Sequence, residues 1–309
     1  MGTISEFTVS SLQDGLELSA MTVMPEGEVR GIVQFVHGMC EHKERYIPIM
    51  EYLSGHGYAC IIHDHRGHGK SVKEPEDLGF FYENGAEALV EDIHQMTVYA
   101  KETFGDIHPF VLLGHSMGSF AVRCYAKKYD REIDKLIVMG SPSYNPAAGV
   151  GLNIIKLLKK LKGERAHSKL LDYMAIESGY EKRFAAEKTK HAWVCSDPEV
   201  VATYNADPLC NYTFTVNGYE NLMKLMAEAY STKGWDDVNA SLPVIFMSGK
   251  EDPCAVNDKA FSEAIRNFKS HGYTCVSGKF YKNMRHEILN EKRKMVVYKD
   301  ILDFIEDNN

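Results

Sequence analysis

The 309-residue sequence lacks the features of a membrane-spanning, secreted or disulfide-stabilised protein. It has no apolar run of the roughly 18 residues that a bilayer-crossing helix needs. Its first residues show neither the basic nor the apolar stretch of a secretory signal peptide. The seven cysteines are scattered and include no CxxC pair. They therefore indicate free thiols rather than disulfides or a zinc site, and we expect a cytoplasmic protein.

Basic charge is also scarce. The chain has 35 Lys and Arg residues against 43 Asp and Glu residues, which gives a formal net charge of -8. Because binding to nucleic acid requires a net basic face, we expect no nucleic-acid partner. The length suits one large α/β domain with an insertion, or two domains. The sequence does not indicate an oligomeric state.

Strand-like and helix-like segments alternate along most of the chain. A hairpin is predicted first, with strands over residues 5–9 and 16–24 around the turn signal Asp14-Gly15. Further strands are predicted over residues 32–36, 59–63, 109–113, 135–139, 242–247 and 274–281. Helices are predicted over residues 46–54, 86–100, 119–129, 258–268 and from about 289 to 305. This alternation predicts a mostly parallel sheet with helices on both faces.

The alternation stops near Pro142 and returns near Leu242. We therefore expect a core formed by residues 1–144 and 236–309, with a mostly helical cap inserted over residues 145–235. The cap begins with an amphipathic stretch over residues 151–162, which has one apolar face and three lysines largely opposite; the apolar residues are Ile154, Ile155, Leu158 and Leu161. This helix either touches lipid aggregates or packs its apolar face on the core, and we favour packing.

The pentapeptide Gly114-His115-Ser116-Met117-Gly118 follows an apolar strand and precedes a helix. The pattern G-x-S-x-G at such a junction is typical of a nucleophile elbow, a sharp turn that lifts a serine hydroxyl clear of the sheet. Glycines are needed two residues before and after the serine, because side chains there would collide with neighbouring backbone. Ser116 is therefore the candidate nucleophile.

A serine hydroxyl needs a base, and the base needs a carboxylate to orient it. After an elbow of this kind the acid precedes the histidine along the chain, and both follow late strands. Asp252 and His286 meet this order, whereas His271 lies ahead of its strand. Glu251 could also supply the carboxylate, and spacing alone does not decide between it and Asp252.

An oxyanion hole needs two N–H donors. The elbow provides the backbone N–H of Met117, and the loop after residues 32–36 provides that of Met39. In the same loop, His37, Glu41 and His42 carry atoms that could ligate a metal, but no companion cluster follows. We expect neither a metal ion nor a cofactor.

Four sequence elements together resemble the monoglyceride lipase and lysophospholipase (serine aminopeptidase-like) group of α/β hydrolases. They are the elbow, the sequence HGMCEH over residues 37–42, HDHRGHGKS over residues 63–71, and Asp252-Pro253. The resemblance covers essentially the whole core, and the motifs over residues 37–42 and 63–71 are far more restrictive than the elbow. It implies an α/β-hydrolase fold and a mobile cap over an acyl-binding pocket. It also implies the triad Ser116, Asp252 and His286, with oxyanion donors at Met39 and Met117.

Two details of the resemblance concern the substrate. The cap is more similar to bacterial lysophospholipase-like members than to the shorter caps of animal monoglyceride lipases. Met39 departs from the small residue common in the lipases, and its larger side chain bears on the substrate length that the pocket admits. Residues 64–71 are expected to stabilise their loop rather than to take part in chemistry.

The sequence therefore predicts a serine hydrolase that cleaves carboxylic esters through an acyl-enzyme on Ser116. Its substrate is expected to be a small acyl ester or lipid, with transient membrane or micelle contact through the cap. Two alternatives stay open: an aminopeptidase-type peptide hydrolase that uses the same triad, and a hydrolase-fold binding protein without catalysis. An aminopeptidase would need an anionic subsite for the substrate amine, and the acidic residues of the cap do not exclude one.

Overall fold

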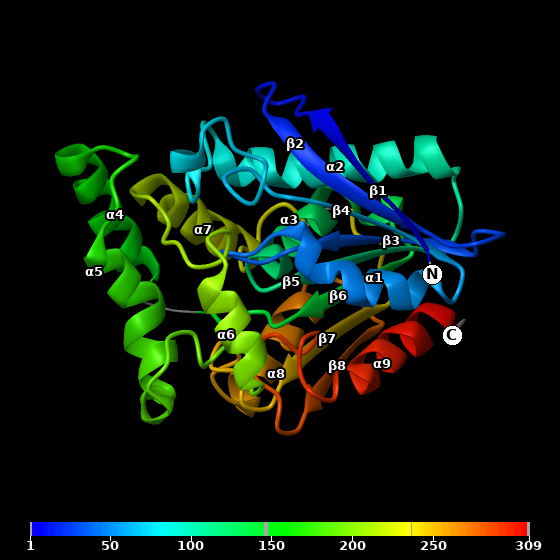
Figure 1. Ribbon diagram of the computed structural model, residues 1–309. Coiled ribbons are helices and arrows are strands. Elements are labelled where there is room, and N and C mark those ends of the chain that lie inside the picture. The colour runs from blue at the N-terminus through cyan, green and yellow to red at the C-terminus, as the bar shows by residue number, and fades with distance from the viewer. Residues whose placement is uncertain (1, 145–147, 236, 308–309) are drawn as a thin grey trace.

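The computed structural model describes residues 2–144, 148–235 and 237–307. Within them, eight strands form one sheet in the order β1-β2-β4-β3-β5-β6-β7-β8 (Figure 1). β2 is antiparallel to β1 and β4, and every other neighbouring pair is parallel. The strands are β1 (Thr3–Ser10), β2 (Glu17–Met24), β3 (Gly31–Val36), β4 (Tyr58–His63), β5 (Phe110–His115), β6 (Lys135–Met139), β7 (Val244–Gly249) and β8 (Val276–Tyr281).

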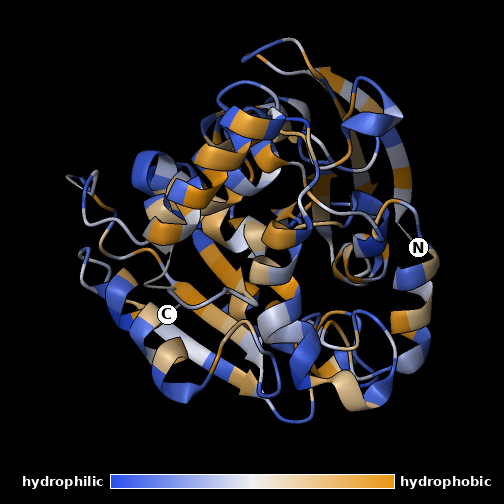
Figure 2. Cartoon of the chain, turned by 90° about the vertical axis from the view of Figure 1, so that its left-hand side faces the viewer, coloured by the Kyte–Doolittle hydropathy of each residue, from blue (hydrophilic) through white to orange (hydrophobic). Residues whose placement is uncertain are grey.

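Helices cover both faces of the sheet, as the alternation predicts. One face carries α2 (Gly85–Phe104), α3 (Met117–Tyr129) and α8 (Asp258–Lys269). The other carries α1 (Ile47–Ser54) and α9 (Lys294–Glu306). Side chains of a strand point alternately to its two faces, so Leu112 of β5 packs in the first layer and Leu113 in the second. Figure 2 shows hydrophobic strands enclosed by helices of mixed hydropathy.

The segment between β6 and β7 is helical, and no strand lies among its described residues. We call it the cap. Its longer helices are α4 (Ala148–Lys162), α6 (Pro198–Ala206) and α7 (Val216–Ala229), with α5 (Lys169–Asp172), the π-helix η4 (Tyr173–Glu181) and the short η5 (Ala185–Glu187) between them. In Figure 1, α4 and α5 stand away from the sheet at the left. The predicted boundaries at 145 and 236 fall on residues outside the described ones.

The helix α4 agrees with the packing alternative in part. Ile155 is buried in the same apolar cluster as Leu225 and Met226 of α7. Leu161, predicted on the same face, is 70% exposed, and Leu157 is 58% exposed. The helix therefore packs along one side and leaves apolar side chains uncovered on another.

The predicted start of the last helix is wrong. The last helix starts at Lys294 rather than near Leu289. The residues before it form a turn, in which the Glu291 carboxylate accepts the backbone N–H groups of Arg285 at 2.8 Å and Ser196 at 2.9 Å. This buried carboxylate fixes a non-helical path that apolar periodicity alone does not reveal.

Three short 3-10 helices complete the core: η1 (Lys43–Tyr46), η2 (Pro75–Asp77) and η3 (Asp130–Glu132). No helix of the described chain has the length and apolar character needed to cross a membrane. All seven cysteines are free thiols, as expected from their spacing. Asp64 accepts the backbone N–H groups of Lys43 and Lys70, which agrees with the stabilising role expected for residues 64–71.

Candidate active site

Ser116 lies between β5 and α3 with φ 53° and ψ -115°, a strained conformation for a residue other than glycine. The two elbow glycines stand where a side chain would not fit. A Cβ atom at Gly114 would lie 2.4 Å from the Gly118 carbonyl oxygen, and one at Gly118 would lie 2.2 Å from the carbonyl oxygen of Val36. The elbow geometry predicted from the pentapeptide is therefore present.

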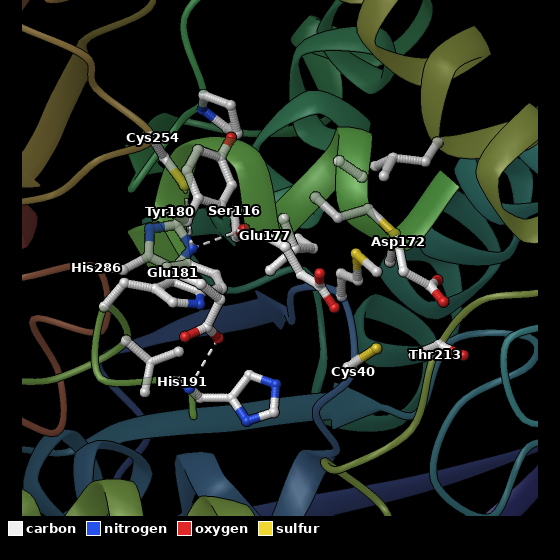
Figure 3. Close-up of a pocket in the computed structure, with 18 of the residues that line it drawn as sticks. Cys40, Ser116, Asp172, Glu177, Tyr180, Glu181, His191, Thr213, Cys254 and His286 are labelled. Carbon is white, nitrogen blue, oxygen red and sulfur yellow. Dashed lines mark hydrogen bonds between the residues drawn. The ribbon is translucent and has the colours of Figure 1, made fainter. Parts of the chain in front are cut away.

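The structure brings together the three residues predicted as a triad. The Ser116 Oγ lies 2.8 Å from His286 Nε2. His286 Nδ1 lies 3.0 and 3.1 Å from the two carboxylate oxygens of Asp252. Ser116 follows β5, Asp252 follows β7 and His286 follows β8, so all three stand at the carboxyl edge of the sheet. Figure 3 shows His286 directed at Ser116.

Asp252 is the carboxylate that contacts His286, whereas the neighbouring Glu251 makes no hydrogen bond to it among the described residues. Burial alone would raise the pKa of Asp252. The His286 imidazole and hydrogen bonds from the Cys254 N–H and the Ser248 hydroxyl oppose burial and hold that pKa below its ordinary value. The carboxylate is thus kept ionised and correctly oriented to accept the Nδ1–H of His286.

Met39 and Met117, the predicted oxyanion donors, both line the cavity beside Ser116. Met117 is the first residue of α3, where a backbone N–H has no partner within the helix. No acceptor in the described parts of the chain takes the N–H of Met39 or Met117. An anion next to Ser116 would therefore meet two free donors and the N-terminus of α3.

Glu41, in the loop that carries Met39, ties this loop to its surroundings. Its Oε1 accepts the backbone N–H of Gly38, the hydroxyl of Tyr46 at 3.1 Å and the Nδ1–H of His115 at 2.9 Å. Burial would raise the pKa of Glu41, but His115 and Arg45 outweigh it and lower that pKa. We call residues 37–42, which carry the predicted donor Met39, the oxyanion loop. An ionised Glu41 therefore joins the oxyanion loop to β5, the strand that leads into Ser116.

Four histidines that the motifs contain form a buried cluster beneath the same loop; they are His37, His63, His65 and His68. The His37 and His65 rings lie 4.0 Å apart between centroids, and those of His63 and His65 lie 5.0 Å apart. Burial lowers the pKa of His37 to about 4, lowers those of His63 and His68 to about 3, and lowers that of His65 well below its ordinary value. All four are neutral at pH 7, which the sequence did not reveal.

The cap contacts the loop that carries His286. Arg285 donates to the carbonyls of Ala192 and Cys195 and pairs with Glu187. The Glu287 N–H donates to the Val194 carbonyl at 2.7 Å. These contacts bring the Trp193 ring to 5.0 Å from that of His286. They join residues about 90 positions apart, so sequence reasoning missed them.

A cavity of about 1050 Å³ lies between the cap and the triad. Apolar side chains from α3, α4 and α7 line one part: Met117, Phe120, Ile155, Leu222, Met223 and Met226. Polar and charged side chains of the cap line another: Glu177, Glu181, Lys182, Lys188, Lys190 and His191. Figure 3 shows Glu177 and Glu181 facing the cavity near Ser116 and His286. The site can hold a molecule with one long apolar part and one polar part.

Two groups of described residues have ligand-type atoms within 4.8 Å of one another. One consists of Asp252, Cys254 and His286 and includes two residues of the predicted triad. The other consists of His42, Asp207 and Cys210 and joins the oxyanion loop to the cap. In it, both ring nitrogens of His42 face carboxylates, and the Arg45 guanidinium lies 3.8 Å from the Cys210 Sγ. This positive charge opposes a metal cation, and His42 forms ion pairs with the carboxylates of Glu44 and Asp207.

Comparison with known proteins adds the family. The family model described as "Serine aminopeptidase, S33" matches residues 27–293. The chain belongs to this family. It is 26% identical over 288 residues to a monoacylglycerol lipase of Mycolicibacterium smegmatis, an alignment that covers 91% of this chain and 90% of that lipase. The predicted membership of the monoglyceride lipase group of α/β hydrolases is confirmed.

Solved structures agree with this assignment. A carboxyl esterase of Bacillus coagulans superposes with a TM-score of 0.87 at 28% identity, over 99% of this chain and 98% of the esterase. A monoglyceride lipase of Saccharomyces cerevisiae superposes with a TM-score of 0.73 at 21% identity, over 99% and 97% of the two chains, and bears on the fold alone. The predicted α/β-hydrolase fold is confirmed.

Proposed function

We propose that this protein is a serine hydrolase of carboxylic esters that acts through an acyl-enzyme on Ser116. The observation that carries the proposal is the unbroken hydrogen-bonded series from Asp252 through His286 to Ser116, with separations of 3.0 and 2.8 Å. Membership of a family with lipase and esterase relatives supports the same reaction class.

In the proposed reaction, His286 Nε2 takes the hydroxyl proton as Ser116 Oγ attacks the ester carbonyl. Asp252 holds the imidazole in the tautomer that leaves Nε2 free and stabilises the imidazolium. The N–H groups of Met39 and Met117 receive the oxyanion, where each donor contributes about 3 kcal/mol to the transition state. His286 returns the proton to the leaving alcohol, and water then releases the acid from Ser116.

We infer that the substrate is an acyl ester of a polar alcohol. The cavity volume of about 1050 Å³ is slightly above the ~300–1,000 Å³ usual for small-molecule sites, which gives room for a long acyl chain. The acyl chain of the substrate would lie along the apolar side chains of α3, α4 and α7, several of which are adaptable methionines. The alcohol would face the polar residues of the cap, and the cap would act as a separate, mobile unit.

The test is a labelling and turnover experiment. An active-site fluorophosphonate should label the wild-type protein, and Ser116→Ala should lose both labelling and hydrolysis of p-nitrophenyl esters. The matched control is Ser277→Ala, because Ser277 is exposed on β8; this variant should keep both labelling and hydrolysis. Undiminished turnover by Ser116→Ala would contradict the mechanism. A panel of p-nitrophenyl esters, monoacylglycerols, lysophospholipids and aminoacyl amides then sets the substrate class, and preference for amides would favour the peptidase alternative.

We further propose that the cap makes transient contact with lipid surfaces. Val150, Leu157 and Leu161 are 63%, 58% and 70% exposed on α4, beside the exposed Lys156 and Lys160. Exposed apolar side chains next to lysines suit an anionic lipid surface.

The lipid contact is tested with the Leu157→Ser/Leu161→Ser double variant. It should bind vesicles of anionic lipid more weakly than the wild-type protein in a flotation assay. Leu12→Ser, at a leucine that is 81% exposed on the β1–β2 turn, should bind as wild type. Equal vesicle binding by the wild-type protein and both variants would contradict a role of α4 in lipid contact.

A further inference from the structure

The loop of the oxyanion donor Met39 contains a residue in an unfavourable conformation. Cys40 has φ 52°, in the left-handed region that residues other than glycine seldom adopt. The loop persists in this shape only where its surroundings hold it. On one side, the Gly38 N–H is bound by Glu41, within the core. The contact that holds the other side is therefore important for where the Met39 N–H points.

That contact comes from the cap. The Tyr204 hydroxyl, on α6, donates to the carbonyl oxygen of Cys40 at 2.8 Å, across 164 positions in the sequence. Tyr204 is only 5% exposed, and burial raises the pKa of its hydroxyl well above the ordinary value, so it is protonated and able to donate. The Gly38–Met39 peptide, which carries the Met39 N–H, thus lies between a core anchor at Gly38 and a cap anchor at Cys40.

Other contacts fix Tyr204 itself. The Arg45 guanidinium lies 4.9 Å from the centre of its ring. Asp197 caps the start of α6 by accepting the Glu199 N–H, and Asp207 at the end of α6 accepts from His42 Nε2 at 2.9 Å. Residues of α6 and its C-terminal end therefore form hydrogen bonds with the oxyanion loop at two residues, Cys40 and His42.

We propose that Tyr204 is a positioning residue for the oxyanion hole, which holds the Met39 N–H in place through the Cys40 carbonyl and so makes the hole depend on the docked cap. The inference rests on the proposed function. It is physically reasonable because one hydrogen bond and the strain of one residue with positive φ are similar in size, so losing the bond lets the loop relax.

The test is Tyr204→Phe, which removes one oxygen and keeps the ring against Arg45. Because loss of a whole oxyanion donor lowers kcat by about 10²–10³, a loosened donor should lower kcat about tenfold. KM for the same p-nitrophenyl ester should stay within about twofold, and affinity for a trifluoromethyl ketone, which presents an oxyanion, should fall with kcat. Hydrogen exchange at the Met39 and Cys40 amides should become faster.

Tyr230→Phe is the matched control. The Tyr230 hydroxyl donates to the Pro142 carbonyl at 2.9 Å, which is also a bond to a backbone carbonyl, but away from the oxyanion loop. This variant should keep kcat, ketone affinity and the exchange rates of the loop. Melting temperatures of both variants show whether the fold is kept.

Two results would overturn the proposal. Unchanged kcat and ketone affinity in Tyr204→Phe would show that the bond does not position the donor. A higher KM with an unchanged kcat would make Tyr204 a substrate contact instead. Neither result would touch the role of Ser116, which the Ser116→Ala experiment tests separately.

Discussion

The buried histidine cluster should make the protein sensitive to mild acid, and His63 allows a clean test. His63 is fully buried at the end of β4, and neither of its ring nitrogens has a hydrogen-bond partner among the described residues. Burial lowers its pKa to about 3 from 6.5. The variant His63→Leu replaces the imidazole with a side chain of similar size that cannot titrate.

The sign of the effect follows from the direction of the pKa change. A histidine whose folded-state pKa is lowered binds a proton more readily in the unfolded state, so the folded state loses stability as pH falls below 6.5. For a pKa of about 3 in the folded state, the loss at pH 5.0 is about 2 kcal/mol, and the loss at pH 7.5 is negligible. The lowered pKa values of His37 and His68 act in the same direction.

The wild-type pH dependence alone would not isolate this effect. Burial would lower the pKa of His42, but hydrogen bonds with Cys210, Glu44 and Asp207 outweigh it and raise that pKa to about 10. The stability contributed by His42 is complete below pH 6.5 and is lost toward pH 10, which partly offsets the acid loss at the cluster. The comparison between variant and wild type removes this contribution because His42 is present in both.

The assay is urea unfolding followed by circular dichroism at pH 7.5 and 5.0, at constant ionic strength. Relative to wild type, His63→Leu should gain about 2 kcal/mol of unfolding free energy on going from pH 7.5 to 5.0. His56→Leu is the control, because His56 is exposed at the end of α1, and it should track wild type at both pH values. If the difference between His63→Leu and wild type is the same at both pH values, the cluster does not carry the acid sensitivity.

Two further predictions concern the elbow and the acid of the triad. Gly118→Ala places a Cβ 2.2 Å from the Val36 carbonyl oxygen, so it should lower the unfolding free energy by at least ~2 kcal/mol and reduce ester hydrolysis. Urea denaturation measures the first effect and turnover of a p-nitrophenyl ester the second. Wild-type values in both assays would contradict the steric argument. Asp252→Asn should lower kcat by about 10⁴ with a normal melting temperature, because an amide favours the wrong imidazole tautomer, whereas Glu251→Gln should keep kcat; the reverse pattern would move the acid to Glu251.

The parts of the site that the sequence predicts are those fixed by local sterics and chain order. The need for Gly114 and Gly118 follows from the elbow turn itself, and their close contacts are the ones expected. Asp252 and His286 could be found because each follows a strand of a parallel sheet, whose carboxyl ends share one edge. Spacing alone could not choose between Asp252 and Glu251, since that choice depends on the direction in which each side chain leaves the turn.

Contacts between cap and core could not be predicted in this way. The Tyr204–Cys40 bond spans 164 positions, and no periodicity connects the two residues. The late start of α9 is a related case, because a hydrogen bond from Ser196 of the cap to Glu291 helps to fix the turn ahead of it. The sequence motifs identify the four histidines but do not predict their burial, because burial depends on how two separate loops pack together.

The oxyanion loop is the place where acid stability and activity meet. His37 Nδ1–H donates to the Gly38 carbonyl, and His37 Nε2 accepts the His65 N–H at 2.9 Å. A proton on Nε2 would remove that acceptor, but burial lowers the pKa of His37 to about 4, so the ring still accepts the His65 N–H at pH 5.5. Tyr204 holds the loop one residue beyond Met39 and does not titrate in this range, since burial raises its pKa. Both anchors therefore stay in place at pH 5.5 and 7.5, so the fold-loss of kcat in Tyr204→Phe relative to wild type should be the same at the two pH values.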